Sequence, residues 1–158
     1  ILASVNDVRL CRLLLCGSVI HTEFPWEMLP QRPLEHILND VGTKDIWPVL
    51  ASASSWGYGS SGTFGFKDPL VHDRFHALRH SDFFSNGHVD KYWVPYLIDG
   101  VVTPSDEDSN RTTTPFWLSS LSLPAVGLLT KVALWGGVIY GLLIAAIWAI
   151  KKAPQVFL

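Results

Sequence analysis

The feature that most constrains this chain is an uncharged, largely apolar run of 19 residues at positions 132–150. About 20 apolar residues in a helix cross the hydrocarbon core of a bilayer. Lysines lie on both sides of the run (Lys131, Lys151, Lys152), and a tryptophan lies near each end, as in the aromatic belts of membrane proteins. The sequence therefore predicts a single-pass, C-terminal membrane helix over 132–150, followed by a short basic tail, 151–158. The lysines leave open on which side of the membrane the rest of the chain lies.

The residues before the run divide into three parts. We expect 1–100 to form a folded α/β unit, 101–115 to be a polar linker rich in Pro, Thr and Ser, and 116–131 to be an apolar segment at the membrane interface. Within the predicted span, Gly137 and Gly141 form a GxxxG pattern that would let a second helix approach closely, and glycines merely tolerated in a span are the alternative.

Composition limits the class of partner. The formal net charge is -2, so no basic field favours nucleic acid, and we expect none as a partner. The chain opens at Ile1 rather than at a methionine, without the pattern of a signal peptide, and we expect it to be part of a longer protein.

Alternating strand and helix patterns occupy the first hundred residues. Apolar runs predict strands at 11–20, 34–42 and 69–76, with a helix after the second strand and an amphipathic helix over 81–100. Such alternation is typical of a mostly parallel sheet, so the fold class we predict is α/β with a partial sheet.

Two titratable residues follow consecutive predicted strands. Asp45 lies three residues after the glycine that ends the second strand, and His80 lies where the last helix of this region begins. An acid after one strand and a histidine after the next is the arrangement in which a carboxylate orients an imidazole. Asp45 capping a helix is the simpler alternative, and both roles are compatible. His76 is a second candidate for the base.

Two other patterns have weaker interpretations. The stretch "GYGSSG" matches GxGxxG, but no long helix can follow it, which favours a turn-rich surface loop over a dinucleotide site. His72, His76 and His80 would share one face of a helix and could bind zinc there, whereas on a strand they would lie too far apart. We predict neither a metal nor a cofactor.

The stretches "GTKDIWP" and "RHSDFF" resemble the C-terminal half of an α/β-hydrolase, in its Gly-x-x-Asp turn and its histidine ahead of the final helix. The resemblance covers roughly residues 8–100 and implies that Asp45 is the acid and His80 the general base of a Ser…Asp…His triad.

The chain departs from that family at the nucleophile. No G-x-S-x-G is present, and Ser60 and Ser61 follow the acid, which is the wrong order for the fold. We expect the nucleophile to lie upstream of Ile1, so that this chain alone would be inactive. The resemblance implies a membrane-anchored serine hydrolase acting on a small-molecule or lipidic ester, and the competing hypothesis is a non-catalytic, membrane-anchored binding or scaffolding module.

Overall fold

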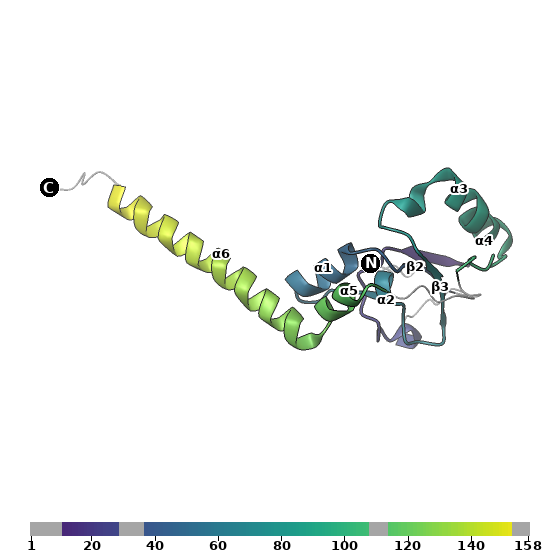
Figure 1. The fold of residues 1–158 in the computed structure, drawn as a ribbon, viewed down its shortest axis with the longest axis horizontal. Helices are drawn as coiled ribbons and strands as arrows, with labels where there is room; N and C mark the ends of the chain where they lie inside the picture. Colours follow the sequence, from purple (N-terminus) through teal and green to yellow (C-terminus); the bar gives the residue numbers. More distant parts are fainter. Residues whose placement is uncertain (1–10, 29–36, 108–113, 153–158) are drawn as a thin grey trace.

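The computed structural model describes residues 11–28, 37–107 and 114–152, and within them it forms a mixed α/β unit with one long C-terminal helix (Figure 1). Three strands form a parallel sheet in the order β1-β2-β3. They are β1 (Leu13–Cys16), β2 (Ile37–Gly42) and β3 (Val71–His76). The α/β class and the parallel sheet are confirmed.

β1 is shorter than the pattern at 11–20 predicts. It ends at Cys16 because Gly17 adopts a left-handed φ of 53°, a conformation that turns the chain out of the sheet. All four residues of β1 are only partly buried, whereas all six residues of β2 are buried between its two neighbours. β2 is therefore the central strand of the sheet and its most buried one.

β2 buries polar residues as well as apolar ones, and each has a partner on β3. In the parallel register Asn39 lies beside Asp73, and Asp40 lies beside Arg74. The Asn39 amide donates to Asp73 Oδ1 at 2.8 Å, and the Arg74 guanidinium donates to both carboxylate oxygens of Asp40 at 2.6 and 3.0 Å. Because side chains alternate along a strand, the two pairs lie on opposite faces of the sheet.

Helices cover both faces of the sheet. α1 (Trp47–Ser54), α2 (Ser61–Phe64) and α5 (Phe116–Leu121) lie on one side in Figure 1, and α3 (Asn86–His88) and α4 (Val94–Asp99) lie on the other. An apolar cluster includes Trp26, from the short 3-10 helix η2 (Trp26–Met28), and Phe66, whose rings meet edge to face at 5.2 Å.

The helix expected over 81–100 is broken into pieces. A 3-10 turn, η3 (Asp82–Phe84), comes first, Ser85 is extended, and the continuous helical run begins only at Asn86. A π-helical turn, η4 (Val89–Trp93), ends two residues before Pro95, which is the second residue of α4 and has no N–H to donate; the wider turn accommodates the proline. The run ends, as predicted, at Gly100, whose φ of 75° caps α4.

The C-terminal helix is longer than the predicted span. α6 (Pro124–Lys152) has 29 residues, about 43 Å at 1.5 Å per residue, and is long and apolar enough to cross a membrane. The segment 116–131 is therefore α5 followed by the first turns of α6. None of the apolar window of α6 is buried, and Figure 1 shows the helix running away from the sheet.

α6 nevertheless touches the folded unit near its start. The indole N–H of Trp135 donates to the carbonyl of Ser54 at the end of α1, at 3.0 Å, and the Trp56 and Trp135 rings lie 6.3 Å apart. The segment 101–107, with which the predicted linker begins, lies against β3, where Thr103 O accepts a hydrogen bond from Arg74.

Candidate functional site

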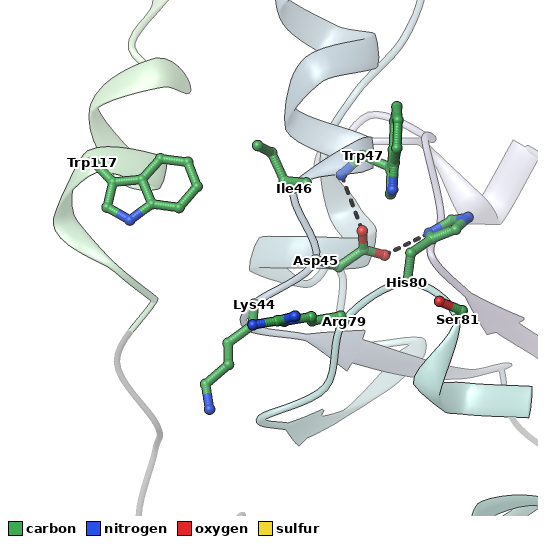
Figure 2. Close-up of a pocket in the computed structure, with 8 residues that line it drawn as sticks. All are labelled: Lys44, Asp45, Ile46, Trp47, Arg79, His80, Ser81 and Trp117. Atoms are coloured by element: carbon green, nitrogen blue, oxygen red, sulfur yellow. Dashed lines mark hydrogen bonds and ion pairs between the residues drawn. The ribbon is translucent and has the colours of Figure 1, made fainter. Parts of the chain in front are cut away.

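Asp45 and His80 meet at one edge of the sheet. Asp45 follows the end of β2 by three residues, and His80 follows the end of β3 by four. Because β2 and β3 are parallel, their carboxyl ends lie together, and Nδ1 of His80 lies 2.8 Å from Oδ2 of Asp45 (Figure 2). An ionised carboxylate can only accept, so Nδ1–H donates and the proton-free nitrogen of the neutral ring is Nε2. The structure brings together the two residues that the sequence singled out.

Asp45 is fully buried, and its remaining carboxylate oxygen and its main-chain carbonyl both accept hydrogen bonds. Its second oxygen, Oδ1, accepts from the backbone N–H of Trp47 at 3.0 Å, at the first turn of α1. Its main-chain carbonyl accepts from the hydroxyl of Thr63 on α2 at 2.7 Å. The N-cap position itself is Ile46, so Asp45 supports the start of α1 from one residue further out while it also binds His80. Asp45 is therefore not the N-cap residue of α1, and its contacts at this edge of the sheet are with the Trp47 N–H and the His80 ring.

The last glycine of the GxGxxG stretch, Gly62, allows α2 to pack closely against the residues that follow β1. A Cβ added at Gly62 would lie 2.3 Å from the backbone nitrogen of Ser18, so only glycine lets α2 approach the exit of β1. The N–H of Gly62 donates to Ser18 O at 2.7 Å, and the hydroxyl of Ser61 donates to Ser18 Oγ at 3.0 Å. This close contact positions α2, and hence Thr63, beneath Asp45.

His80 is the exposed member of the pair, with 47% of its side chain accessible, whereas the Asp45 side chain is 0% accessible. Gly17, at the exit of β1, lies against the ring: a Cβ there would fall 2.7 Å from Cε1 of His80. In Figure 2 the second ring nitrogen points away from Asp45. Within 11–28, 37–107 and 114–152, no serine hydroxyl bonds to this ring.

A pocket of about 370 Å³ opens beside the pair. Its lining combines two cations, two indoles, an aliphatic side chain and a serine (Figure 2): Lys44, Arg79, Trp47, Trp117, Ile46 and Ser81. Trp117 comes from α5, far along the chain from the other lining residues. The exposed imidazole therefore lies beside a space of the size that a small chemical group can enter.

His76, the alternative base, lies elsewhere. It is the last residue of β3, is 4% exposed, and its Nδ1 lies 3.1 Å from the hydroxyl of Ser105. Its Nε2 lies 3.4 Å from Asp40, not near Asp45. Because 71–76 is a strand rather than a helix, His72 and His76 are separated along it, and the zinc arrangement with His80 does not form.

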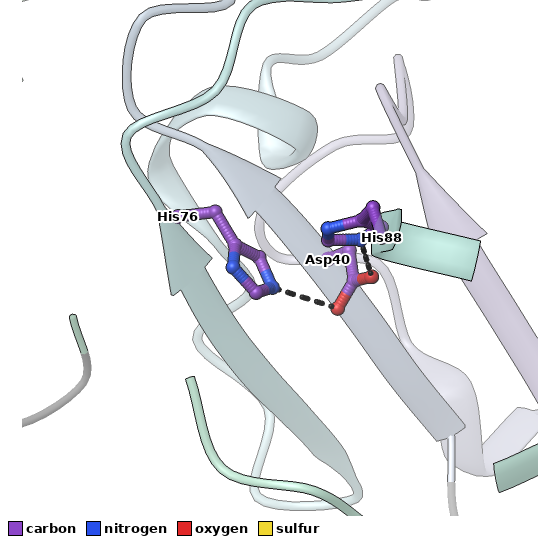
Figure 3. Close-up of side chains that lie close together, drawn as sticks. All are labelled: Asp40, His76 and His88. Atoms are coloured by element: carbon purple, nitrogen blue, oxygen red, sulfur yellow. Dashed lines mark hydrogen bonds and ion pairs between the residues drawn. The ribbon is translucent and has the colours of Figure 1, made fainter. Parts of the chain in front are cut away.

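A second cluster of titratable side chains was missed by the sequence analysis (Figure 3). Asp40 is fully buried and receives, besides Arg74, the Nε2–H of His88 at 3.0 Å and the indole N–H of Trp93 at 2.7 Å. Burial raises the pKa of Asp40, but the nearby His76 ring and the hydrogen bonds from His88 and Arg74 outweigh burial and hold its pKa well below the ordinary value. Asp40 is thus a carboxylate anion deep in the fold.

The ligand atoms of Asp40, His76 and His88 lie close enough to hold a metal ion. Arg74, however, donates to both Asp40 oxygens and already supplies the balancing positive charge, which a metal ion would have to displace. The cluster instead joins β2 to residues on both sides of the His80 loop, His76 before it and His88 after it. Its effect is to hold in place the segment that presents His80.

Comparison with protein-family models, curated proteins and solved structures finds no match to this chain. The fold and the site therefore define its class by themselves. The chain is a mixed α/β protein with a parallel sheet of three strands in its described part and a C-terminal helix long and apolar enough to cross a membrane.

Proposed function

We propose that this chain supplies the acid and the histidine of a membrane-anchored serine hydrolase, with a partial sheet of the α/β-hydrolase type. One observation carries the proposal: a buried carboxylate, Asp45, holds Nδ1 of a half-exposed imidazole, His80, beside a pocket. The order of the strands and the place of the acid and histidine after consecutive strands support the hydrolase type.

In this mechanism Nε2 of His80 takes the proton of a serine hydroxyl as the serine oxygen attacks the carbonyl carbon of an ester. Asp45 holds the ring and stabilises the imidazolium that forms. His80 then gives the proton to the departing alcohol, leaving an acyl-serine, and a water molecule activated by the same nitrogen releases the acid. The serine is proposed to come from sequence N-terminal to Ile1.

The test uses the natural full-length protein in which these 158 residues occur, with a serine-directed fluorophosphonate and a chromogenic ester. His80→Ala is expected to lower both labelling and kcat/KM by about 10⁴-fold, and Asp45→Asn by a similar factor. His72→Ala, which changes an exposed histidine on β3, is the matched control and should leave both unchanged. Unchanged labelling of a folded His80→Ala protein would refute the assignment.

A non-catalytic, membrane-anchored binding module is the second proposal. It is supported by the observation that no serine hydroxyl in the described part of the chain bonds to His80. Absence of fluorophosphonate labelling in the natural full-length protein, together with retained folding, would favour the module over the enzyme.

A further inference from the structure

Two positively charged side chains line the pocket beside His80. Lys44 and Arg79 are both exposed, both line the pocket, and neither side chain has an ion-pair partner among the residues the structure describes. The acid in the pocket, Asp45, is already bound to His80. Figure 2 draws both cations on the side of the pair that faces Trp117. The free charges favour an anionic group on the ligand that enters.

The rim of the pocket is aromatic. Trp47 is 59% exposed and Trp117 is 54% exposed, and Phe116, next to Trp117 on α5, is 87% exposed. Leu118, on the same helix, is fully buried and anchors α5 to the folded unit. Tryptophan side chains are enriched at the interface between lipid headgroups and acyl chains, because an indole ring has an apolar body and one polar N–H.

The pocket also lies close to the membrane helix. α1 begins beside Asp45 at Trp47 and ends at Ser54, whose carbonyl accepts the Trp135 indole where the uncharged run of α6 starts. Eight residues of helix span about 12 Å, so the start of α1, beside the pocket, is at most about 12 Å from its end at Ser54, where Trp135 makes contact. A headgroup layer is roughly 5 to 8 Å thick on each side of the bilayer, so a pocket at most about 12 Å from that contact lies within the headgroup layer or a few Å above it.

We propose that this pocket takes an anionic lipid ester directly from the bilayer that α6 crosses. Lys44 and Arg79 hold the anionic headgroup, Trp47 and Trp117 contact the interface, and the ester carbonyl lies beside His80. This assignment of substrate class rests on the proposed hydrolase function for the reaction, whereas lipid binding at the pocket can be tested without it.

The first test places individual tryptophans relative to the membrane. The full chain is labelled with 5-fluorotryptophan and reconstituted in nanodiscs, so that each of its 7 tryptophans gives a fluorine resonance. Phenylalanine variants at 47 and 117 assign the two rim signals. A phospholipid with a nitroxide near its headgroup should broaden those two signals while buried Trp26 stays sharp. Rim signals as sharp as Trp26 would overturn the proposal.

The second test asks whether the headgroup charge matters. Nitroxide-labelled phosphatidylglycerol is compared with nitroxide-labelled phosphatidylcholine at equal mole fraction. Each basic residue near the surface should enrich the anionic lipid around the pocket by roughly fivefold. The labelled anionic lipid should therefore broaden the Trp117 signal several-fold more than the labelled neutral lipid does. The double variant Lys44→Gln/Arg79→Gln should abolish that difference, and Lys67→Gln/Lys91→Gln, the same charge change at cations paired elsewhere, should retain it. Equal broadening by both lipids in the unmodified chain would overturn the anionic-lipid assignment.

The two proposals fail separately. Equal broadening by both lipids in the unmodified chain refutes the pocket assignment, whatever the fluorophosphonate result is. Labelling that is independent of His80, with lipid selectivity intact, refutes the hydrolase and leaves an anionic-lipid binding pocket.

Discussion

Replacing Asp40 by asparagine is the sharpest test of how the His80 loop is held. The change keeps the shape of the side chain but removes the negative charge that faces Arg74, whose side chain is 0% accessible. It also replaces one carboxylate oxygen by an amide NH₂. That group is a donor, and it would face the donors of Arg74, His88 or Trp93 in place of an acceptor. A buried cation is then left without its counter-ion.

The expected cost follows from that loss. Removing one partner of a buried ion pair destabilises a protein by about 3 to 5 kcal/mol, out of a total free energy of unfolding of about 5 to 15 kcal/mol for a domain. Asp40→Asn should therefore lose a large part of the stability of the folded unit. Asp90→Asn, at an exposed position on η4, is the matched control and should change stability by less than about 0.5 kcal/mol.

The assay is urea unfolding of the full chain in detergent micelles, followed by near-ultraviolet circular dichroism. The aromatic cluster around His76, His88 and Tyr92 reports on tertiary packing, whereas α6 would keep its helical signal in micelles. A loss below about 1 kcal/mol for Asp40→Asn would refute the reasoning, because Arg74 would then need no counter-ion.

The pH dependence supplies an independent check with a defined sign. The pKa of Asp40 is lower in the folded chain than in the unfolded chain, so the carboxylate stabilises the fold above its unfolded pKa of about 3.9. That contribution is lost as pH falls below about 4, where the unfolded chain takes up a proton that the folded one resists. Stability of the unmodified chain should fall more steeply below pH 4 than that of Asp40→Asn, and parallel curves would contradict the ion-pair account.

Three further substitutions test separate contacts. Gly17→Ala would put a Cβ 2.7 Å from the His80 ring at a φ of 53°, so we expect the low-field Nδ1–H proton signal of His80 to shift or vanish in NMR spectra; an unchanged signal would argue against this packing. Arg12→Ala removes hydrogen bonds of 2.9 Å to the carbonyls at the end of α4, and hydrogen exchange there should quicken by about fivefold, equivalent to about 1 kcal/mol. Gly137→Leu meets nothing within 4 Å of its Cβ in the single chain, so the fold should be unaffected while energy transfer between labelled chains in micelles decreases; the same energy transfer as in the unmodified chain would exclude pairing through Gly137 and Gly141.

Much of the fold could be predicted from patterns that are local in the sequence. The uncharged run predicts a membrane-length helix because backbone groups in lipid must bond within their own segment. The strands at 37–42 and 71–76 were found from apolar runs between turn residues, and the meeting of Asp45 with His80 follows from parallel strands that end at one edge. Each of these inferences needs only residues that are near one another in the chain, together with one rule about strand direction.

The tertiary structure alone decided which polar residues are buried together. Asp40, His88 and Trp93 meet although they are up to 53 residues apart, and in the sequence Asp40 looks like any aspartate near a turn. His76 was the alternative candidate for the base, but it is part of β3, two residues after Arg74, and so lies on the Asp40 face of the sheet. Glycine at position 62 is required because α2 approaches the backbone of Ser18. Burial and contact depend on strand register and on how helices pack across the sheet, and these are set by partners far along the chain.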